Sequence, residues 1–329
     1  MYIVPVFVPH AGCIHECTFC NQRLISGQQQ FNISNVQTQL VSFIERLPSD
    51  KPKQVALYGG SFTAIDMGVQ REILQYISSV ADKYNITSLR ISTRPDCINT
   101  DNLSMLAQYK VQVVELGVQS LDDSVLALAK RGHSADVVAP AVRLLQEQGF
   151  QVGIQLMVGM QGQSLQMVQD TAQQVVKLKP DMVRIYSMMV LKDTELAQRY
   201  LSGDFTPLSL EQTVEQAAYI WQTMRASSIK VIRMGLQAEE LLTESIIAGS
   251  YHPAFGELVV QRHYLEVLQK EIAVLQAQGA SMVKISYPQR MASKIIGMKK
   301  ANKLALQAQF PELKIFWQTD EQVAELSVQ

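Results

Sequence analysis

Residues 2–20 read YIVPVFVPHAGCIHECTFC, an apolar run followed at once by three cysteines in the pattern Cys-x3-Cys-x2-Cys. The run has the length and β-branched content of a buried strand. Cys13, Cys17 and Cys20 then fall in the segment that leaves this strand. Thiolates at this spacing converge on one soft metal centre, either zinc or an iron–sulfur cluster. This stretch therefore predicts a metal-binding loop at the carboxyl end of the first strand.

Alternation of strand and helix continues from this point to about residue 205. Five further apolar runs predict strands, at residues 54–58, 88–92, 111–116, 151–158 and 182–188. Amphipathic segments lie between the runs, and their starts are marked by the N-cap candidates Ser34, Asp66, Thr100, Ser120, Ser134 and Ser164. Repeated right-handed βαβ units form a parallel sheet whose functional groups lie at the carboxyl ends of the strands. Six units predict a partial (β/α)6 TIM-like barrel, with a doubly wound sheet as the alternative.

After about residue 205 the regular alternation ends. The later segments predict helices at 209–226, 255–278 and 289–309 and strands at 230–236, 282–287 and 313–317. We therefore expect a partial barrel over residues 1–205 and a small α+β extension over residues 206–329, the candidate for substrate binding.

Composition and charge exclude several classes of protein. Lys and Arg number 29 against 30 Asp and Glu, so the total charge gives no nucleic-acid or membrane footprint. No apolar run reaches about 18 residues, and no basic residue precedes the apolar N-terminus, which predicts neither a membrane span nor a signal peptide. We expect a cytoplasmic chain. Four cysteines are too few for a disulfide framework at this length, which again favours a metal site.

The cysteine triplet after a first strand resembles the signature of the radical S-adenosylmethionine (SAM) superfamily. Within it, the chain resembles the radical SAM domain and C-terminal extension of the catalytic subunit of Elongator and, more loosely, oxygen-independent coproporphyrinogen III oxidase. The motifs that carry this resemblance are GGSFT at 59–63, STRPD at 92–96, ELGVQS at 115–120, RGH at 131–133, VIR at 231–233 and HPAF at 252–255. Elongator carries an acetyltransferase domain after the extension. The chain here stops at Gln329, so we do not expect acetyl transfer within it.

The resemblance implies that Cys13, Cys17 and Cys20 ligate a 4Fe-4S cluster whose open iron binds SAM. Reductive cleavage of SAM then gives a 5′-deoxyadenosyl radical that abstracts hydrogen from a substrate. By position in the family, the candidate SAM-binding residues are Phe19, Gly59, Gly60, Ser61, Thr93, Arg94 and Gln119. Phe19 stands where the family keeps an aromatic residue against adenine. Ser61 departs from the pattern, because the family often has glutamate at that place.

Each of these assignments has a plainer alternative. A glycine pair such as Gly59-Gly60 also fits a tight turn, and Arg94 also fits an ion pair. Gln155 lies inside an apolar strand and needs a partner, so we expect it to face the barrel interior.

Four more residues stand near the motifs. Tyr186 and Met188 end the sixth strand near the expected adenine site, although both residue types are more often core. His133 fits a helix entry, and Cys97 fits a structural thiol.

The extension contains a basic segment. No acidic residue lies between Glu271 and Glu312, and the segment carries Lys284, Arg290, Lys294, Lys299, Lys300 and Lys303. Such a segment can bind RNA phosphates, with Tyr287 stacking on a base, or it can be a solvated helix face.

These features lead to three functional hypotheses. The favoured one is a radical SAM enzyme that acts on tRNA or another RNA and takes electrons from a donor such as a flavodoxin or ferredoxin. The second keeps the same chemistry on a small, porphyrin-like molecule. The third is a non-enzymatic zinc-binding module in which His10 or His15 completes the site.

Overall fold

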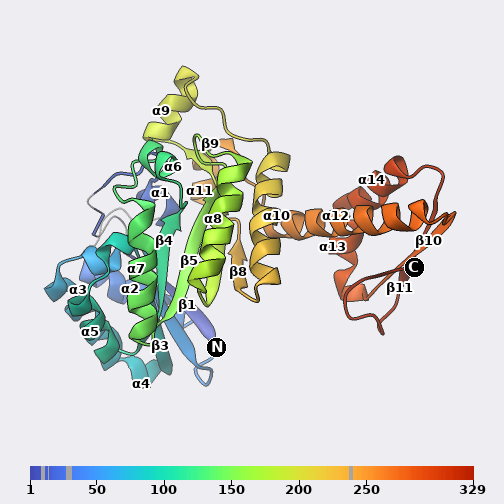
Figure 1. The fold of residues 1–329 in the computed structure, drawn as a ribbon. Helices are drawn as coiled ribbons and strands as arrows, with labels where there is room; N and C mark the ends of the chain where they lie inside the picture. The colour runs from blue at the N-terminus through green and yellow to red at the C-terminus, as the bar shows by residue number, and fades with distance from the viewer. Residues whose placement is uncertain (9–11, 14, 27–31, 237–239) are drawn as a thin grey trace.

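Seven parallel strands form one curled sheet in this computed structural model (Figure 1). The structure describes residues 1–329 except 9–11, 14, 27–31 and 237–239. In spatial order the strands are β1 Tyr2–Val8, β2 Lys53–Gly59, β3 Ile86–Thr93, β4 Val111–Gln119, β5 Gln151–Val158, β6 Met182–Ser187 and β8 Lys230–Met234. The edges β1 and β8 do not pair, so the predicted partial TIM-like barrel with a small extension is confirmed. The seventh strand, β8, comes from the segment after the predicted boundary at residue 205.

Helices follow the strands and cover the outer face of the sheet (Figure 1). The longer ones are α2 Ile33–Ile44, α3 Met67–Ser79, α5 Thr100–Gln108, α7 Val138–Glu147, α8 Leu165–Leu178 and α10 Leu210–Ala226. Shorter ones are α1 Gln22–Ser26, α4 Ala81–Tyr84, α6 Asp123–Leu128, α9 Glu195–Ser202 and α11 Glu240–Ser245. A two-stranded ribbon of β7 Met189–Leu191 and β9 Ile246–Gly249 stands beside them.

Side-chain caps begin most of the longer helices. Asp66 and Ser164 cap α3 and α8 as predicted. In three other helices the prediction is wrong by one or two residues, because an Asn or Asp side chain there accepts the free backbone N–H groups: Asn32, Asn99 and Asp122 replace Ser34, Thr100 and Ser120. Ser134 makes no side-chain cap bond at its 3-10 turn.

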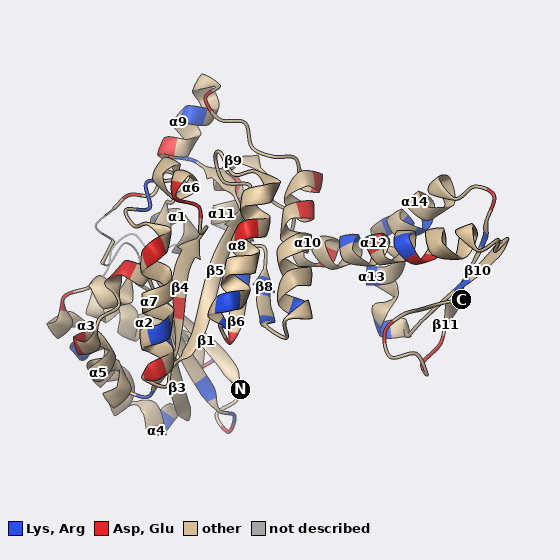
Figure 2. Ribbon diagram, in the orientation of Figure 1, with Lys and Arg blue, Asp and Glu red and all other residues tan. Residues whose placement is uncertain are grey.

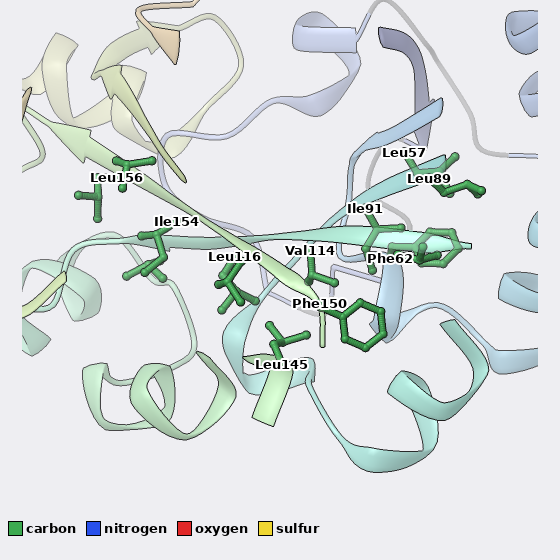
Figure 3. Packing of buried hydrophobic residues seen from close by; sticks show 14 of the residues in the cluster. Leu57, Phe62, Leu89, Ile91, Val114, Leu116, Leu145, Phe150, Ile154 and Leu156 are labelled. Carbon is green, nitrogen blue, oxygen red and sulfur yellow. The ribbon is translucent and has the colours of Figure 1, made fainter. Parts of the chain in front are cut away.

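Apolar side chains on the outer face of the strands form the main core. Figure 3 shows Leu57, Ile91, Leu116 and Ile154 from four neighbouring strands in one cluster. Leu145 of α7 packs against this layer. Alternate residues of a strand point to opposite faces, so this outer layer leaves the remaining strand positions facing the interior of the half barrel.

The interior-facing positions carry a buried ionic network. The Glu115 carboxylate of β4 accepts hydrogen bonds from the guanidinium groups of Arg90 on β3 and Arg184 on β6. Arg184 also donates from Nη2 to the Tyr58 hydroxyl of β2 at 2.8 Å. Glu115 is only 4% exposed, and a Cβ on Gly153 would lie 2.9 Å from its Cγ. Gly153 therefore leaves the room that this carboxylate occupies.

The chain after residue 260 forms a second, smaller core. Helix α12 Phe255–Ala277 leads from the half barrel to a lobe built on β10 Met282–Tyr287, β11 Lys314–Thr319 and β12 Ser327–Val328 (Figure 1). The buried clusters of the two lobes meet on α12, where Val259 belongs to the first and Val260 to the second. The division at residues 205 and 206 stays a prediction, although the packing itself changes here.

Two expectations for this lobe are wrong. The predicted helix 289–309 is divided into α13 Ala292–Ile296 and α14 Ala301–Gln309, because Gly297 has a φ of 83° and a left-handed turn follows it. Tyr287 is 5% exposed and packs against Trp317 with ring centroids 6.3 Å apart, so it does not present its ring to a base. Among the described helices, none is long and apolar enough to cross a membrane.

We predict that Glu115→Gln lowers the free energy of unfolding by about 3 kcal/mol, because two buried guanidinium groups lose their counter-charge. Denaturant titration followed by circular dichroism measures this loss. The matched control is Glu195→Gln, whose carboxylate pairs with Lys130 and Arg199 at the surface and contributes less than about 1 kcal/mol. Equal effects in the two variants would contradict a structural role for the network.

Candidate functional site

The cysteine loop is held in place by backbone hydrogen bonds to two helices. The Thr18 N–H donates to the Ala129 carbonyl at the end of α6 at 3.1 Å, and the Leu196 N–H of α9 donates to the Thr18 carbonyl at 2.8 Å. Thr18 lies between Cys17 and Cys20 and is 3% exposed. The middle of the motif is therefore fixed at the carboxyl end of the sheet.

Two glycines allow the loop to approach the turn after β2. Gly12 has a φ of 72°, and a Cβ there would lie 2.2 Å from the Ser61 carbonyl oxygen. Gly59 has a φ of 113°, and a Cβ there would lie 3.3 Å from backbone atoms of Val8. Both positions therefore require glycine. The neighbouring Ser61 is 1% exposed, and its backbone N–H lies close enough to act on the Cys13 thiol.

A buried arginine lies among the thiols. The Arg131 Nη1 group donates to Cys17 Sγ at 3.2 Å, and Nη2 donates to the Gly117 carbonyl on β4. Arg131 is 7% exposed, and its Nε group has no hydrogen-bond partner among the described residues. The guanidinium is thus a fixed positive charge at the cysteine loop.

The three thiols act on one another electrostatically. Burial raises the pKa of Cys20 to about 12, and the nearby Cys17 and Cys13 add to the rise, while Arg131 opposes it. Burial and then Cys17 likewise raise the pKa of Cys13. Three soft donors that repel each other as thiolates need a nearby positive centre, which is what an iron–sulfur cluster ligated by cysteines provides. The chemistry of these three donors therefore fits such a group.

The structure describes only one of the two histidines considered as a fourth ligand to zinc. The His15 ring lies against Gly132, where a Cβ would come within 2.2 Å of it. His10 lies outside the described residues. Within the ranges that the structure describes, no three His, Cys, Asp or Glu side chains lie close enough to hold a single metal ion.

Thr93 and Arg94 at the end of β3 are paired within the protein. The Thr93 hydroxyl bonds the Thr63 hydroxyl at 2.6 Å. Arg94 donates to both carboxylate oxygens of Asp96, at 2.9 and 2.6 Å. This ion pair is the alternative stated for Arg94 above. The role of both residues toward a ligand stays a prediction.

Two glutamines meet inside the half barrel. Gln155 of β5 donates from Nε2 to Gln119 Oε1 of β4 at 3.2 Å, so the expected interior partner of Gln155 is found. Gln119 is 4% exposed and has a φ of 69°, which is unusual for a residue with a side chain. The bulge at the end of β4 therefore aims this amide into the interior.

An apolar group forms beside the cysteine loop. Phe19, Tyr186 and Met188 pack in one cluster, although they come from the loop and from the end of β6. The structure thus brings together the three residues expected near adenine. Gly60 follows β2 and is partly exposed.

His133 and Cys97 lie near the same charges. Burial lowers the pKa of His133, and the Arg131 and Arg94 charges act in the same direction. Burial raises the pKa of Cys97 to about 11, with Asp96 as the next contribution. Within the described part of the chain, neither side chain forms a hydrogen bond with the thiols of Cys13, Cys17 or Cys20.

Sequence analysis quoted Arg131 and Glu115 only within the RGH and ELGVQS motifs, and it missed the contact of Arg131 with Cys17 and the ionic network around Glu115. A signal was available for the network, because Arg90, Glu115 and Arg184 are charged residues inside otherwise apolar strands and must find partners. The same argument identified Gln155. For the contact between Arg131 and Cys17 the sequence offers no such signal, since the two residues lie 114 positions apart.

Comparison with known proteins gives consistent matches. The chain is 32% identical over 198 residues to a tRNA uridine(34) acetyltransferase of Methanocaldococcus infernus, covering 59% of this chain and 36% of that protein. An uncharacterized protein of Methanocaldococcus jannaschii is 25% identical over 80% of this chain and 79% of its own length. The chain thus spans less than half of the acetyltransferases it matches.

Solved structures share the fold. The Elp3 protein of Methanocaldococcus infernus, lacking its N-terminus, has a TM-score of 0.62 at 24% identity and matches 82% of this chain and 63% of that one. Coproporphyrinogen III oxidase of Escherichia coli has a TM-score of 0.51 at 17% identity and matches 80% of this chain and 58% of that one.

Two family models cover most of the chain. The radical SAM superfamily model matches residues 7–175, and the radical SAM C-terminal domain model matches residues 180–266. The first match includes the cysteine loop and the motifs at 59–63, 92–96, 115–120 and 131–133, and it sets aside the hypothesis of a non-enzymatic zinc module. The chain therefore belongs to the radical SAM superfamily of enzymes.

Proposed function

We propose that Cys13, Cys17 and Cys20 hold a 4Fe-4S cluster, that SAM binds beside it, and that the enzyme modifies tRNA. The observation that carries the cofactor assignment is the Cys-x3-Cys-x2-Cys loop after β1, where the buried Arg131 donates to Cys17. When bound, the cluster and SAM supply a 5′-deoxyadenosyl radical that abstracts hydrogen from the substrate.

In this proposal, the residues of the chain bind and orient SAM. Phe19, Tyr186 and Met188 form an apolar surface suited to an adenine ring. Gly60 is partly exposed and has no side chain to block a ligand, and Gln119 directs its amide into the half barrel. Burial of the surrounding strands excludes water from a reactive radical.

The choice of tRNA rests on the relatives named tRNA uridine(34) acetyltransferase, which match 59% and 65% of this chain. Because the chain spans only part of those proteins, acetyl transfer does not carry over. We also propose a flavodoxin or ferredoxin as the electron donor and a cytoplasmic location, as expected for a tRNA-modifying enzyme.

We predict that anaerobic reconstitution gives about four irons per chain and broad absorption from thiolate-ligated iron. Cys17→Ala should lose the cluster and all formation of 5′-deoxyadenosine from SAM and dithionite, because one of three ligands is gone. Cys97→Ala is the matched control and should keep both. Undiminished product from Cys17→Ala would show that the cluster lies elsewhere.

Replacement of Arg131 should change the cluster's midpoint potential. Reduction adds negative charge, and the guanidinium beside Cys17 favours the reduced state. Arg131→Met should shift the potential, measured by titration with electron paramagnetic resonance, to more negative values. Arg131→Lys keeps the charge and should shift it less. Identical potentials in wild type and Arg131→Met would contradict this role.

The identity of the substrate is tested by whether a candidate molecule stimulates the cleavage of SAM. Unmodified tRNA should stimulate the formation of 5′-deoxyadenosine. One of its nucleosides should also change in mass, which mass spectrometry of the digested RNA measures. Coproporphyrinogen III is the comparison substrate, and we expect no stimulation by it. Stimulation by the porphyrinogen alone would favour the small-molecule hypothesis instead.

A further inference from the structure

The C-terminal lobe after residue 266 lies beyond both family models. Its sheet has the order β11-β10-β12, with β10 in the centre. Figure 2 shows Lys and Arg on the helices of this lobe and near its strands. The basic residues of this lobe therefore lie on more than one surface.

The helical side uses some of its basic groups inside the lobe. The Arg290 guanidinium donates to the Ala324 carbonyl at 2.7 Å, and the Lys303 ammonium lies 5.9 Å from the centre of the Trp317 ring. Lys299 and Lys300 are exposed and remain free for solvent or a ligand, since neither is in an ion pair within the described residues.

Lys284 lies on a different surface, the open face of the sheet. In the parallel register of β10 and β11, Lys284 pairs with Phe316 and Met282 pairs with Lys314. Paired residues point to the same side of a sheet. Phe316 is 53% exposed and Met282 is 57% exposed, and both lysines are exposed. The alternate positions Val283 and Ile285 are buried against α12 and α14, so the two faces of the sheet differ sharply.

The open face thus combines an exposed aromatic ring with two lysines that form no ion pair within the described residues. Its exposed members are Met282 and Lys284 on β10 and Lys314, Phe316 and Gln318 on β11; Ser286 of β10, at 8% exposed, and the half-buried Ser327 of β12 continue the face toward its covered end. None of them is acidic. Lys284 lies directly across from Phe316, and Lys314 lies two residues along the same strand, roughly 6.6 Å away. Exposed aromatic rings next to lysines on a sheet are the elements with which proteins bind single-stranded nucleic acid.

We propose that this open face, centred on Phe316, binds a single-stranded segment of RNA, with one base stacked on the ring and phosphates bound by Lys284 and Lys314. The proposal rests on the proposed function and identifies the part of the chain that contacts the RNA outside the cysteine site. Charge complementarity favours RNA over a second copy of the chain, because the face is basic and would repel itself.

The test measures binding of the full chain to a fluorescent single-stranded 12-mer of uridine and to an unmodified tRNA transcript across a range of salt concentrations. Phe316→Ala should weaken binding of the 12-mer about ten-fold, since one stacked base is lost. Lys284→Gln with Lys314→Gln should weaken it and reduce the slope of log K against log salt by about 1.4, because two phosphate contacts are lost. Lys299→Gln with Lys300→Gln removes the same charge from the helical side and should leave affinity within two-fold.

The outcomes separate the two proposals. Wild-type protein that binds neither RNA would overturn this inference and the RNA substrate together. Normal binding by the Phe316 and sheet-lysine variants would overturn only the surface assignment, as would an equal loss in the Lys299 and Lys300 variant. Light scattering on all proteins identifies a dimer, and a dimer abolished by Phe316→Ala would assign the face to a second copy instead. Each of these residues is exposed, so circular dichroism should show folded variants.

Discussion

One buried carboxylate, that of Glu115, determines the character of the half barrel. It lies between Arg90 and Arg184, so strands β3, β4 and β6 are joined by charge as well as by backbone pairing. An ionised group at this depth is tolerated only when its partners satisfy it. Tyr58 extends the network to β2, and burial with the Glu115 charge raises the pKa of Tyr58 to about 12, so its hydroxyl stays protonated and accepts from Arg184. The interior is therefore polar and fixed, whereas the outer face is an ordinary apolar core.

The same strand connects this network to the cysteine loop. Two residues after Glu115, the Gly117 carbonyl accepts from Arg131, which in turn donates to Cys17. A shift of β4 would thus move the cation that lies among the thiols. The cysteine loop and the ionic network are thus both attached to β4, at positions two residues apart along the strand.

The features that could be predicted were those determined by local sequence. The strands carry long β-branched runs, and the cysteine triplet has a spacing with few structural alternatives, so the order of elements and the candidate ligands followed directly. The missed features depend on contacts between distant residues. Arg131 meets Cys17, and Tyr287 turns into the core because the period of β10 places it on the buried face. The prediction of one helix over 289–309 was wrong. The segment has helical periodicity, but Gly297 and the left-handed residues after it interrupt the helical backbone.

The arrangement of the two lobes bears on the size of the substrate. Helix α12 has 23 residues, and at 1.5 Å per residue it is about 35 Å long. It runs from the half barrel to the C-terminal lobe, with Val259 in one core and Val260 in the other. A small organic molecule at the cysteine loop would have no contact with the open face around Phe316. A folded RNA is large enough to contact both regions, so the proposed role of the open face agrees with the proposed macromolecular substrate.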